Sequence, residues 1–266
     1  TITGTMTGTV ADPTGATIGG ASVVVVQTAT GAQRTVQTND VGNFLIGSLQ
    51  PGVYTMTVTS PGFKALQRTN IVLASAETLA IPRLTLEIGE VSDQVTVEAE
   101  GVAVQVASSE RAGVITTGQL ENLMTKGRNP MSLLSLLPGV VDRQSIGNQE
   151  RVDRNFDISV QGNRRNANTV TVDGMPLNAM GNNFNSVLMV GQDAIAEVKV
   201  LLSNYPAEYG RSSGATVNFI TKSGSKEFHG LVSYFKRHEQ FNANDFFNNR
   251  LSREKPRYRY NTWNYN

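Results

Sequence analysis

The chain has 266 residues, of which 39% are hydrophobic and 17% are charged, and its formal net charge is +1. This apolar content supports folded cores and excludes a globally disordered chain. The small net charge argues against a nucleic-acid-binding protein, since such domains usually carry a basic stripe. The chain contains no cysteine, which excludes disulfides, thiolate zinc sites and cysteine nucleophiles.

Residues 1–88 have the pattern of an all-β domain. Residues 23–26 form a β-branched run after two glycines, and residues 84–88 alternate between apolar and polar side chains. Tyr54, Met56 and Val58 share one face of a predicted strand, with threonines on the other. Closely spaced strands broken by glycine and proline predict a β-sandwich.

Residues 89–106 differ from the sandwich in composition. They are acidic and rich in valine, and they lack the bulky side chains that anchor a segment in a core. We predict an extended linker with one strand-forming piece, residues 94–97. From the residues alone, a plain linker and an ordinary sandwich strand stay open. A short segment of this kind can also add a strand to the sheet edge of a partner.

Residues 107–226 predict a mixed α/β domain. Thr116 and Gln119 form a capping box, which predicts a short helix that ends at Gly127. Pro130 opens a second predicted helix over residues 131–137. The predicted strands cover residues 156–161, 168–173, 196–202 and 215–221.

The strand at residues 196–202 has a clear alternation. Its even-numbered positions are apolar, whereas Glu197 and Lys199 interrupt them. We therefore expect one face of this strand to be buried.

Two polar loops, residues 161–168 and 178–185, lie between the predicted strands. Their amides could contact a sugar or a peptide, or they could only cap strands and turns. The candidate ligand-contact residues are Asn163, Arg164, Arg165, Asn166, Asn182 and Asn183.

From residue 227 onward the pattern predicts the first strands of another domain. Residues 231–235 form a strand candidate with apolar residues on both faces, and residues 242–249 read as a polar loop. Aromatic residues at strand ends suit a membrane-interface girdle, and a protein interface is the alternative. They are Tyr258, Tyr260, Trp263 and Tyr265. The sequence stops in this aromatic, strand-like run without a polar tail, which we interpret either as truncation or as the limit of the ordered residues.

Sites for other chemistry are weakly indicated. Ser212 stands in a G-x-S-x-G pattern, but a nucleophile elbow needs a following helix and a strand is predicted instead. A turn is therefore favoured over a serine nucleophile. His229 and His238 lack the spacing of a zinc site.

The N-terminal motifs resemble the carboxypeptidase regulatory-like domain, a transthyretin-like β-sandwich without peptidase activity. They are residues 4–15 (GTMTGTVADPTG), 39–44 (NDVGNF) and 49–55 (LQPGVYT).

The later motifs resemble the plug domain of TonB-dependent outer-membrane receptors. They are residues 136–140 (LLPGV), 158–162 (ISVQG), 170–177 (VTVDGMPL), 195–200 (IAEVKV), 207–210 (AEYG) and 216–222 (TVNFITK). Gln161 departs from the family's arginine at that position, which puts a local salt bridge in doubt. A sandwich ahead of such a plug resembles the Oar-like subgroup.

Between the two domains, a six-residue stretch resembles a TonB box. It consists of Asp93, Gln94, Val95, Thr96, Val97 and Glu98. The resemblance implies that TonB, from the inner-membrane energy-transducing complex, binds these residues.

The resemblance implies a multidomain protein of the bacterial outer membrane. Its parts would be a transthyretin-like sandwich (1–88), a linker with the TonB box (89–106), an α/β plug domain (107–226) and the start of a truncated outer-membrane β-barrel (227–266). The sandwich and the TonB box would lie in the periplasm, and the missing barrel would contact lipid.

The implied function is TonB-dependent active import of an extracellular ligand, such as a sugar, peptide or siderophore, with the plug gating the barrel. No cofactor, catalytic residue or nucleic-acid partner is expected. The alternatives are an Oar-like surface or adhesion protein without import and, further off, a serine hydrolase.

Overall fold

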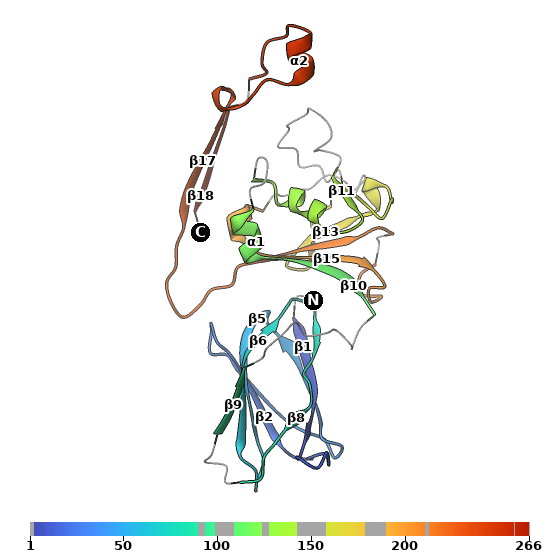
Figure 1. Cartoon of the computed structure of the whole chain (residues 1–266), viewed down its shortest axis with the longest axis vertical. Coiled ribbons are helices and arrows are strands. Elements are labelled where there is room, and N and C mark those ends of the chain that lie inside the picture. Colours follow the sequence, from blue (N-terminus) through green and yellow to red (C-terminus); the bar gives the residue numbers. More distant parts are fainter. Residues whose placement is uncertain are drawn as a thin grey trace.

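The computed structural model describes residues 3–89, 94–98, 109–123, 128–142, 158–178, 190–210, 213–257 and 259–265. An N-terminal β-sandwich lies at one end of the long axis, below a central mixed sheet (Figure 1). A C-terminal hairpin runs beside the central sheet and extends past it (Figure 1).

Two sheets form the sandwich, as the alternating sequence predicts. The first has the order β4 (Asn43–Leu49), β1 (Gly4–Ala11), β7 (Thr78–Ala80), and β8 (Leu84–Thr85) also pairs with β1. The second has the order β3 (Gln33–Gln37), β2 (Ser22–Gln27), β5 (Gly52–Thr59), β6 (Ala65–Leu73), β9 (Gln94–Glu98). Tyr54, Met56 and Val58 of β5 point into one shared core, and Met6 and Leu86 are fully buried there.

The structure changes the interpretation of the predicted linker. Strand β9 does form within it, but β9 joins the second sheet of the sandwich as a parallel neighbour of β6. Val95 packs against the sandwich core. A single valine therefore anchors the segment, although the segment lacks bulky side chains.

The central sheet has the order β10 (Arg111–Thr116), β15 (Ile195–Ser203), β16 (Thr216–Thr221), β13 (Thr169–Val172), β14 (Met175–Pro176). A small second sheet pairs β11 (Val140–Asp142) with β12 (Ile158–Val160). Asp173 and Gly174 link β13 to β14, both with positive φ (49° and 83°). A tight hairpin turn requires that conformation at both central positions, which explains the Asp-Gly pair.

Both predicted helices exist, but each differs from its prediction. Helix α1 (Thr117–Asn122) begins at the predicted cap, where the Thr116 backbone N–H donates to Gln119 Oε1. It ends at Asn122 because Leu123 is already extended, so the predicted end at Gly127 is wrong. The second helix is a 3₁₀ helix, η2 (Pro130–Leu136). Its seven residues make it longer than most 3₁₀ helices, which run for about three to four residues.

The C-terminal part is a hairpin of β17 (Val232–His238) and β18 (Arg259–Tyr265). Many of its apolar side chains are exposed, and the Tyr234 and Trp263 rings stack with centroids 4.2 Å apart. Among the residues described here, no helix has the length and apolar character needed to cross a membrane.

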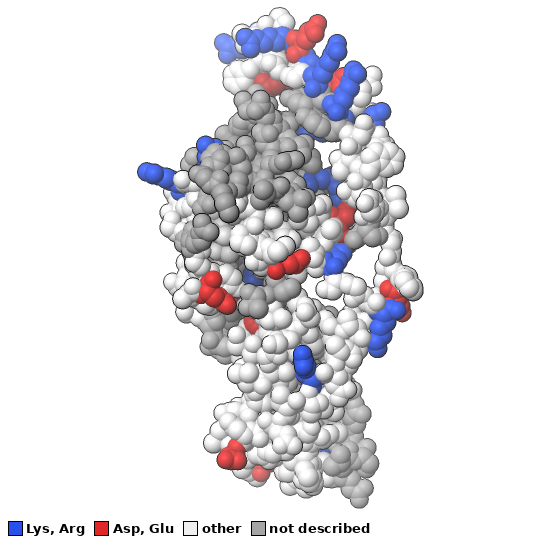
Figure 2. Space-filling view, turned by 180° about the vertical axis from the view of Figure 1, so that it is seen from behind, with Lys and Arg blue, Asp and Glu red and all other residues white. Residues whose placement is uncertain are grey.

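The connection between the two strands holds the 3₁₀ helix η5 (Glu239–Phe241) and helix α2 (Phe246–Arg250). The polar-loop prediction is therefore wrong for residues 246–249, because Asp245 caps the helix by accepting from the Phe247 backbone N–H. On the face seen in Figure 2, charged side chains gather toward this end, and the sandwich carries few.

Candidate functional site

The candidate coupling segment is strand β9. It pairs in parallel with β6 over five residues, from Ala65 opposite Gln94 to Thr69 opposite Glu98. Val95 is half-buried against the core and Thr96 is exposed. Asp93 lies outside the described residues. Five of the six predicted TonB-binding residues therefore form one continuous strand.

Strand β9 is the last strand of its sheet. Within the described part of the chain, no strand pairs with its outer edge. An edge strand presents unpaired backbone donors and acceptors, to which another strand can add. The segment thus has the geometry that β-strand addition needs.

A second feature is the junction between the sandwich and the central sheet, which centres on Lys199 of β15. Only 3% of Lys199 is exposed. Its Nζ lies 3.0 Å from Glu110 Oε1, and it donates to the Ser75 and Ala76 carbonyls at 3.1 and 2.8 Å. An ammonium has three protons to donate, and these contacts use them all. Lys199 thus joins β15 to the sandwich loop between β6 and β7.

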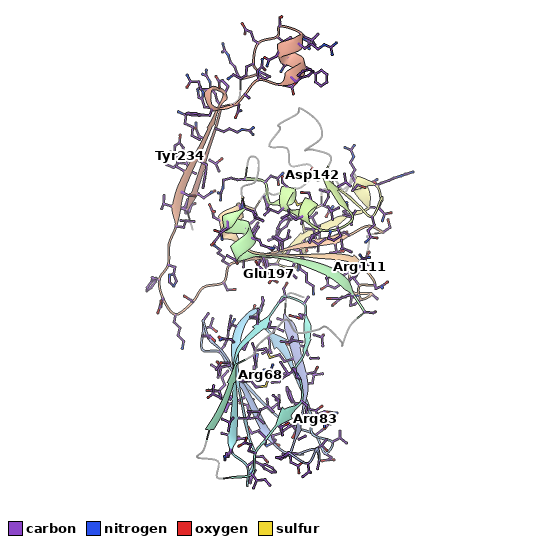
Figure 3. All side chains as sticks on the ribbon, viewed as in Figure 1. Arg68, Arg83, Arg111, Asp142, Glu197 and Tyr234 are labelled. Carbon is purple, nitrogen blue, oxygen red and sulfur yellow. The ribbon has the colours of Figure 1, made fainter. Side chains whose placement is uncertain are left out.

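Glu197 adds a second bond at this junction. It lies on the side of the central sheet that is turned to the sandwich (Figure 3), and its Oε1 accepts from the Ser75 backbone N–H at 2.9 Å. Burial raises the pKa of the neighbouring Glu77, although the Ala74 backbone N–H and Lys199 oppose this effect. Acidic groups from three segments, Glu77 of the loop, Glu197 of β15 and Glu110 before β10, therefore lie near one buried lysine.

The burial of Lys199 corrects the sequence interpretation of its strand. Val198, Val200 and Leu202 are buried as predicted, but Lys199 and Leu201 on the other face are buried too. The sandwich contacts this second face, which a strand pattern alone does not show.

The structure describes the first polar loop, residues 161–168, whereas the second lies outside the described residues after Asn178. Asn163 lies near the loop that leads into β16, where its side-chain N–H donates to the Ser213 carbonyl. Arg164, Arg165 and Asn166 are exposed at η3 (Arg165–Ala167). Asn182 and Asn183 lie outside the described residues. The first loop thus brings three candidate ligand-contact side chains to the surface.

Asn168 organises this loop, although the sequence patterns did not indicate that role. It is 1% exposed. Its side-chain N–H donates to the Ile158 carbonyl, and its Oδ1 accepts from the Ala215 backbone N–H. A Cβ on Gly214 would lie 2.5 Å from that oxygen, so Gly214 makes room for it. The available signal was an asparagine at the first position of a predicted strand.

The C-terminal hairpin contacts the central domain through Asp193 of η4 (Gln192–Ala194). Asp193 forms an ion pair with Arg128 and accepts from Ser233 and Asn264 at 3.0 and 2.8 Å. Arg128 also lies over the Phe235 ring, 3.8 Å from its centroid. The hairpin is therefore fixed to the central domain by polar and cation–π contacts.

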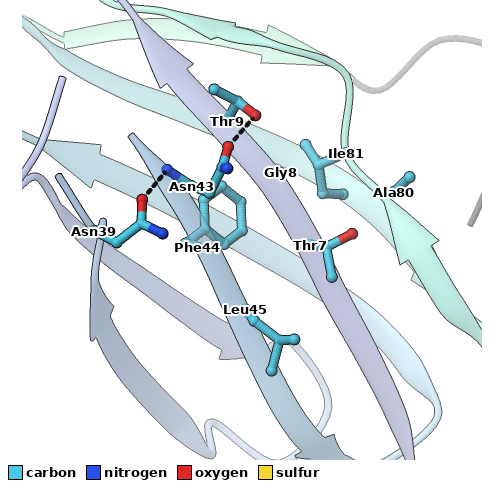
Figure 4. Close-up of a pocket in the computed structure, with 9 residues that line it drawn as sticks. All are labelled: Thr7, Gly8, Thr9, Asn39, Asn43, Phe44, Leu45, Ala80 and Ile81. Atoms are coloured by element: carbon cyan, nitrogen blue, oxygen red, sulfur yellow. Dashed lines mark hydrogen bonds between the residues drawn. The ribbon is translucent and has the colours of Figure 1, made fainter. Parts of the chain in front are cut away.

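A hollow of about 490 Å³ lies on the first sheet of the sandwich, around Gly8 and Phe44 (Figure 4). Its polar side chains bond one another: Thr9 donates to Asn43 Oδ1 at 2.7 Å, and the Asn43 backbone N–H donates to Asn39 Oδ1 at 2.8 Å. These contacts stabilise the turn before β4 and converge on no ligand position.

The described residues give no support to the serine-hydrolase alternative. Ser212 lies outside the described residues, and strand β16, rather than the helix of a nucleophile elbow, follows at Thr216. Within the described ranges, no three histidine, aspartate or glutamate residues lie close enough to hold a metal ion.

Three family models match successive parts of the chain. The carboxypeptidase regulatory-like domain matches residues 5–87, the TonB-dependent receptor plug domain residues 105–217, and the outer membrane beta barrel domain residues 220–266. The chain belongs to the TonB-dependent receptor family. The central domain is therefore the plug, and the protein is one of the bacterial outer membrane.

A curated relative is the TonB-dependent transporter Oar of Myxococcus xanthus, 30% identical over 226 residues. That alignment covers 80% of this chain, which spans only 20% of the length of the relative.

Among solved structures, the siderophore receptor PirA of Acinetobacter baumannii aligns with 22% identity and a TM-score of 0.39. The alignment covers 50% of this chain and 20% of that receptor. A catechol 1,2-dioxygenase from Acinetobacter aligns over 36% of this chain and 58% of its own, with 11% identity and a TM-score of 0.28. No functional conclusion rests on either likeness.

Proposed function

We propose that the protein imports a ligand across the outer membrane in a TonB-dependent manner, with the plug gating a β-barrel. The proposal depends mainly on one observation: β9, which precedes the plug in the sequence, is the last strand of the sandwich sheet and has an open outer edge among the described residues. The family models and the Oar relative support the same function. Import breaks no bond in the ligand, so the proposal includes no catalytic residue.

In this proposal Asp93, Gln94, Val95, Thr96, Val97 and Glu98 bind TonB. A TonB strand pairs with the segment through backbone hydrogen bonds, and alternate side chains give the selectivity. We propose the same domain limits as before: the transthyretin-like sandwich at 1–88, the linker with the TonB box at 89–106, the plug at 107–226 and the start of the barrel at 227–266. The sandwich and the TonB box would lie in the periplasm.

We assign ligand contact to the exposed end of the first polar loop. Arg164, Arg165 and Asn166 present two cationic side chains and one amide there. These groups suit an anionic or hydroxyl-rich ligand. Asn163 anchors the loop through its hydrogen bond to the Ser213 carbonyl. The proposed ligand contact of Asn182 and Asn183 depends on the sequence alone.

The decisive experiment measures binding of the purified periplasmic domain of TonB to the chain in detergent. Thr96→Pro removes a backbone donor from the strand, whereas Thr96→Val keeps a strand-forming residue. We expect Thr96→Pro to weaken binding at least tenfold and Thr96→Val to leave it within about twofold, a tenfold change being about 1.4 kcal/mol. Equal binding by both variants would contradict the assignment of the segment.

Uptake separates import from adhesion. Deletion of residues 93–98 in cells should abolish energy-dependent accumulation of the ligand and leave its surface binding intact. Adhesion that persists in a strain without any TonB-dependent accumulation would favour the surface-protein alternative.

A further inference from the structure

The sandwich contacts the plug through the loop between β6 and β7, residues 74–77. The Ser75 backbone N–H donates to Glu197 Oε1, and the Ser75 and Ala76 carbonyls both accept from Lys199 Nζ. Ala76 has a positive φ of 46°, a conformation that residues with a Cβ rarely adopt. This turn presents two successive carbonyls to one ammonium, so the loop is shaped to fit β15.

Docking of this loop covers a second face of the plug sheet. Val198 and Val200 of β15 pack in the plug core, whereas Lys199 and Leu201 lie on the opposite face and are only 3% and 1% exposed. Lys199 contacts the sandwich loop from that face. A strand that loses one of its two covering layers exposes apolar surface to water, which is unfavourable. Release of the sandwich would therefore weaken the plug sheet at β15.

The sandwich also contacts the segment that connects the plug to the C-terminal hairpin, residues 222–231. This segment passes beside the sandwich (Figure 1), where the Lys226 backbone N–H donates to the Ala29 carbonyl at 3.4 Å. A Cβ on Gly31 would lie 2.2 Å from Lys226 Nζ, so the glycine makes room for the lysine side chain. Two separate turns of the sandwich therefore contact two separate parts of the chain, β15 and the hairpin connection.

The junction at β15 has features that oppose permanent docking. Ser75 is fully buried, and its hydroxyl has no hydrogen-bond partner among the described residues; a buried unpaired hydroxyl costs free energy. The Lys199–Glu110 pair is buried as well, and desolvation opposes much of the attraction within such a pair. The positive φ of Ala76 adds backbone strain. Specific contacts that carry strain are found at switch regions, and this combination suits a contact that can be released.

We infer that the sandwich is a releasable clasp, which holds β15 and the hairpin connection together and must leave β15 before the plug sheet opens. This inference rests on the proposed function, because import requires the plug to move within the barrel. The docked sandwich stabilises the closed plug. Since coupling between two equilibria is reciprocal, a change that weakens docking also favours opening of the plug sheet.

Amide hydrogen exchange of β15 tests the clasp, with the substitution placed in the sandwich and the readout in the plug. Ser75→Asp adds a buried carboxylate beside Glu197, so it should release the loop. In the full chain in detergent, we expect the β15 amides to exchange at least tenfold faster, since their exchange reports local opening of the sheet. The amides of β5 should keep their protection, which would show that the sandwich stays folded.

Val41→Asp is the matched control, because Val41 is 57% exposed in a turn at the other end of the sandwich. At that end the Val10 backbone N–H donates to the Gly42 carbonyl, whereas at the docking end the Thr5 backbone N–H donates to the Glu77 carbonyl. This variant should leave β15 exchange within about twofold of the parent rate, because it adds the same charge away from the junction.

Ser75→Ala separates the backbone contacts from the side chain. It keeps the N–H and the carbonyl that contact Glu197 and Lys199 and removes only the unpaired hydroxyl. The β15 amides should therefore be at least as well protected in this variant as in the parent chain.

A disulfide tests the second contact and does not depend on the folding of Ser75→Asp. The chain has no natural cysteine. A backbone hydrogen bond between strands places two Cα atoms about 5.5 Å apart, within the span of a disulfide, so Ala29→Cys/Lys226→Cys should form a bond. Oxidation should slow β15 exchange at least threefold relative to the reduced chain, because it raises the effective concentration of the sandwich at the plug.

Each outcome decides a stated point. Equal β15 exchange in Ser75→Asp and Val41→Asp, with β5 protected, would overturn the clasp, and so would faster exchange in Ser75→Ala. Equal exchange in the oxidised and reduced disulfide variant, or failure of that disulfide to form, would overturn it as well. None of these results bears on TonB binding. Loss of TonB binding in the unmodified chain would overturn the proposed function and leave the exchange rates unchanged.

Discussion

Replacing Lys199 by methionine should open the junction between the sandwich and the plug. The substitution keeps a long side chain but removes the ammonium from Glu110 and from the Ser75 and Ala76 carbonyls. Side-chain exposures of 4% and 6% mark the Lys199–Glu110 pair as buried. Breaking a buried pair by removing one partner costs about 3–5 kcal/mol, because the remaining charge stays in a poorly solvated place.

The chain contains a matched control for this prediction. Lys222 and Glu121 form an ion pair of the same length, 3.0 Å, but their side chains are 33% and 58% exposed. Exposed pairs contribute about 0–1 kcal/mol. Lys222→Met should therefore have a small effect. The two ion pairs have equal N–O distances, so the predicted difference in stability comes from their different burial.

Amide hydrogen exchange at Ser75 provides the assay. Its backbone N–H donates across the junction to Glu197, so its exchange reports local opening. A loss of about 3 kcal/mol corresponds to exchange faster by on the order of 100-fold. Lys199→Met/Glu110→Gln should recover part of this loss, since it also removes the opposing charge. Equal exchange in Lys199→Met and Lys222→Met would refute the reasoning.

Three further expectations concern other parts of the chain. Burial raises the pKa of Glu77 above its ordinary value of 4.5, so the folded state binds this proton more tightly than the unfolded state, and the free energy of unfolding falls as the pH rises above 4.5. The stability of Glu77→Gln relative to the parent chain should therefore increase from pH 4 to pH 8 in denaturant unfolding. A stability difference that stays constant with pH would contradict this. Asn168→Ala should lower the free energy of unfolding by about 1–3 kcal/mol, because it removes buried hydrogen bonds. Asn166→Ala, at an exposed position, should lower it by less than about 0.5 kcal/mol. Equal unfolding midpoints for the two variants would argue against Asn168 as the residue that stabilises the loop. Trp263, the only tryptophan and 69% exposed, should shift its fluorescence to the blue when detergent is added, and unchanged emission would exclude an apolar surrounding for that face of the hairpin.

The sequence predicted those features that depend on local alternation and turns. The strands that were predicted by position lie near their predicted places, because their alternate residues face a core that is close in space; they cover residues 23–26 and 54–58 of the sandwich and residues 168–173, 196–202 and 215–221 of the plug. The Thr116 cap is also local. Asp245 was an available helix-start signal that the polar-loop interpretation overlooked.

What the sequence did not predict depends on contacts between distant segments. Lys199 reaches the Ser75 carbonyl, 124 positions earlier in the chain, and no strand pattern contains that information. The docking of β9 is of the same kind. Five residues with one half-buried valine are compatible with a linker unless the edge of β6 is known to lie beside them.

The two unpredicted contacts lie on the same route from the coupling segment to the plug. After β9, the chain re-enters the described structure at Ser109, and Glu110 directly precedes β10, the edge strand that pairs with β15. Glu110 is also the acidic partner of Lys199. Tension applied to the chain at β9 would reach the plug first at Glu110. The same residue helps to hold the sandwich on the plug, so force on the segment would act on that junction before it acts on the plug sheet.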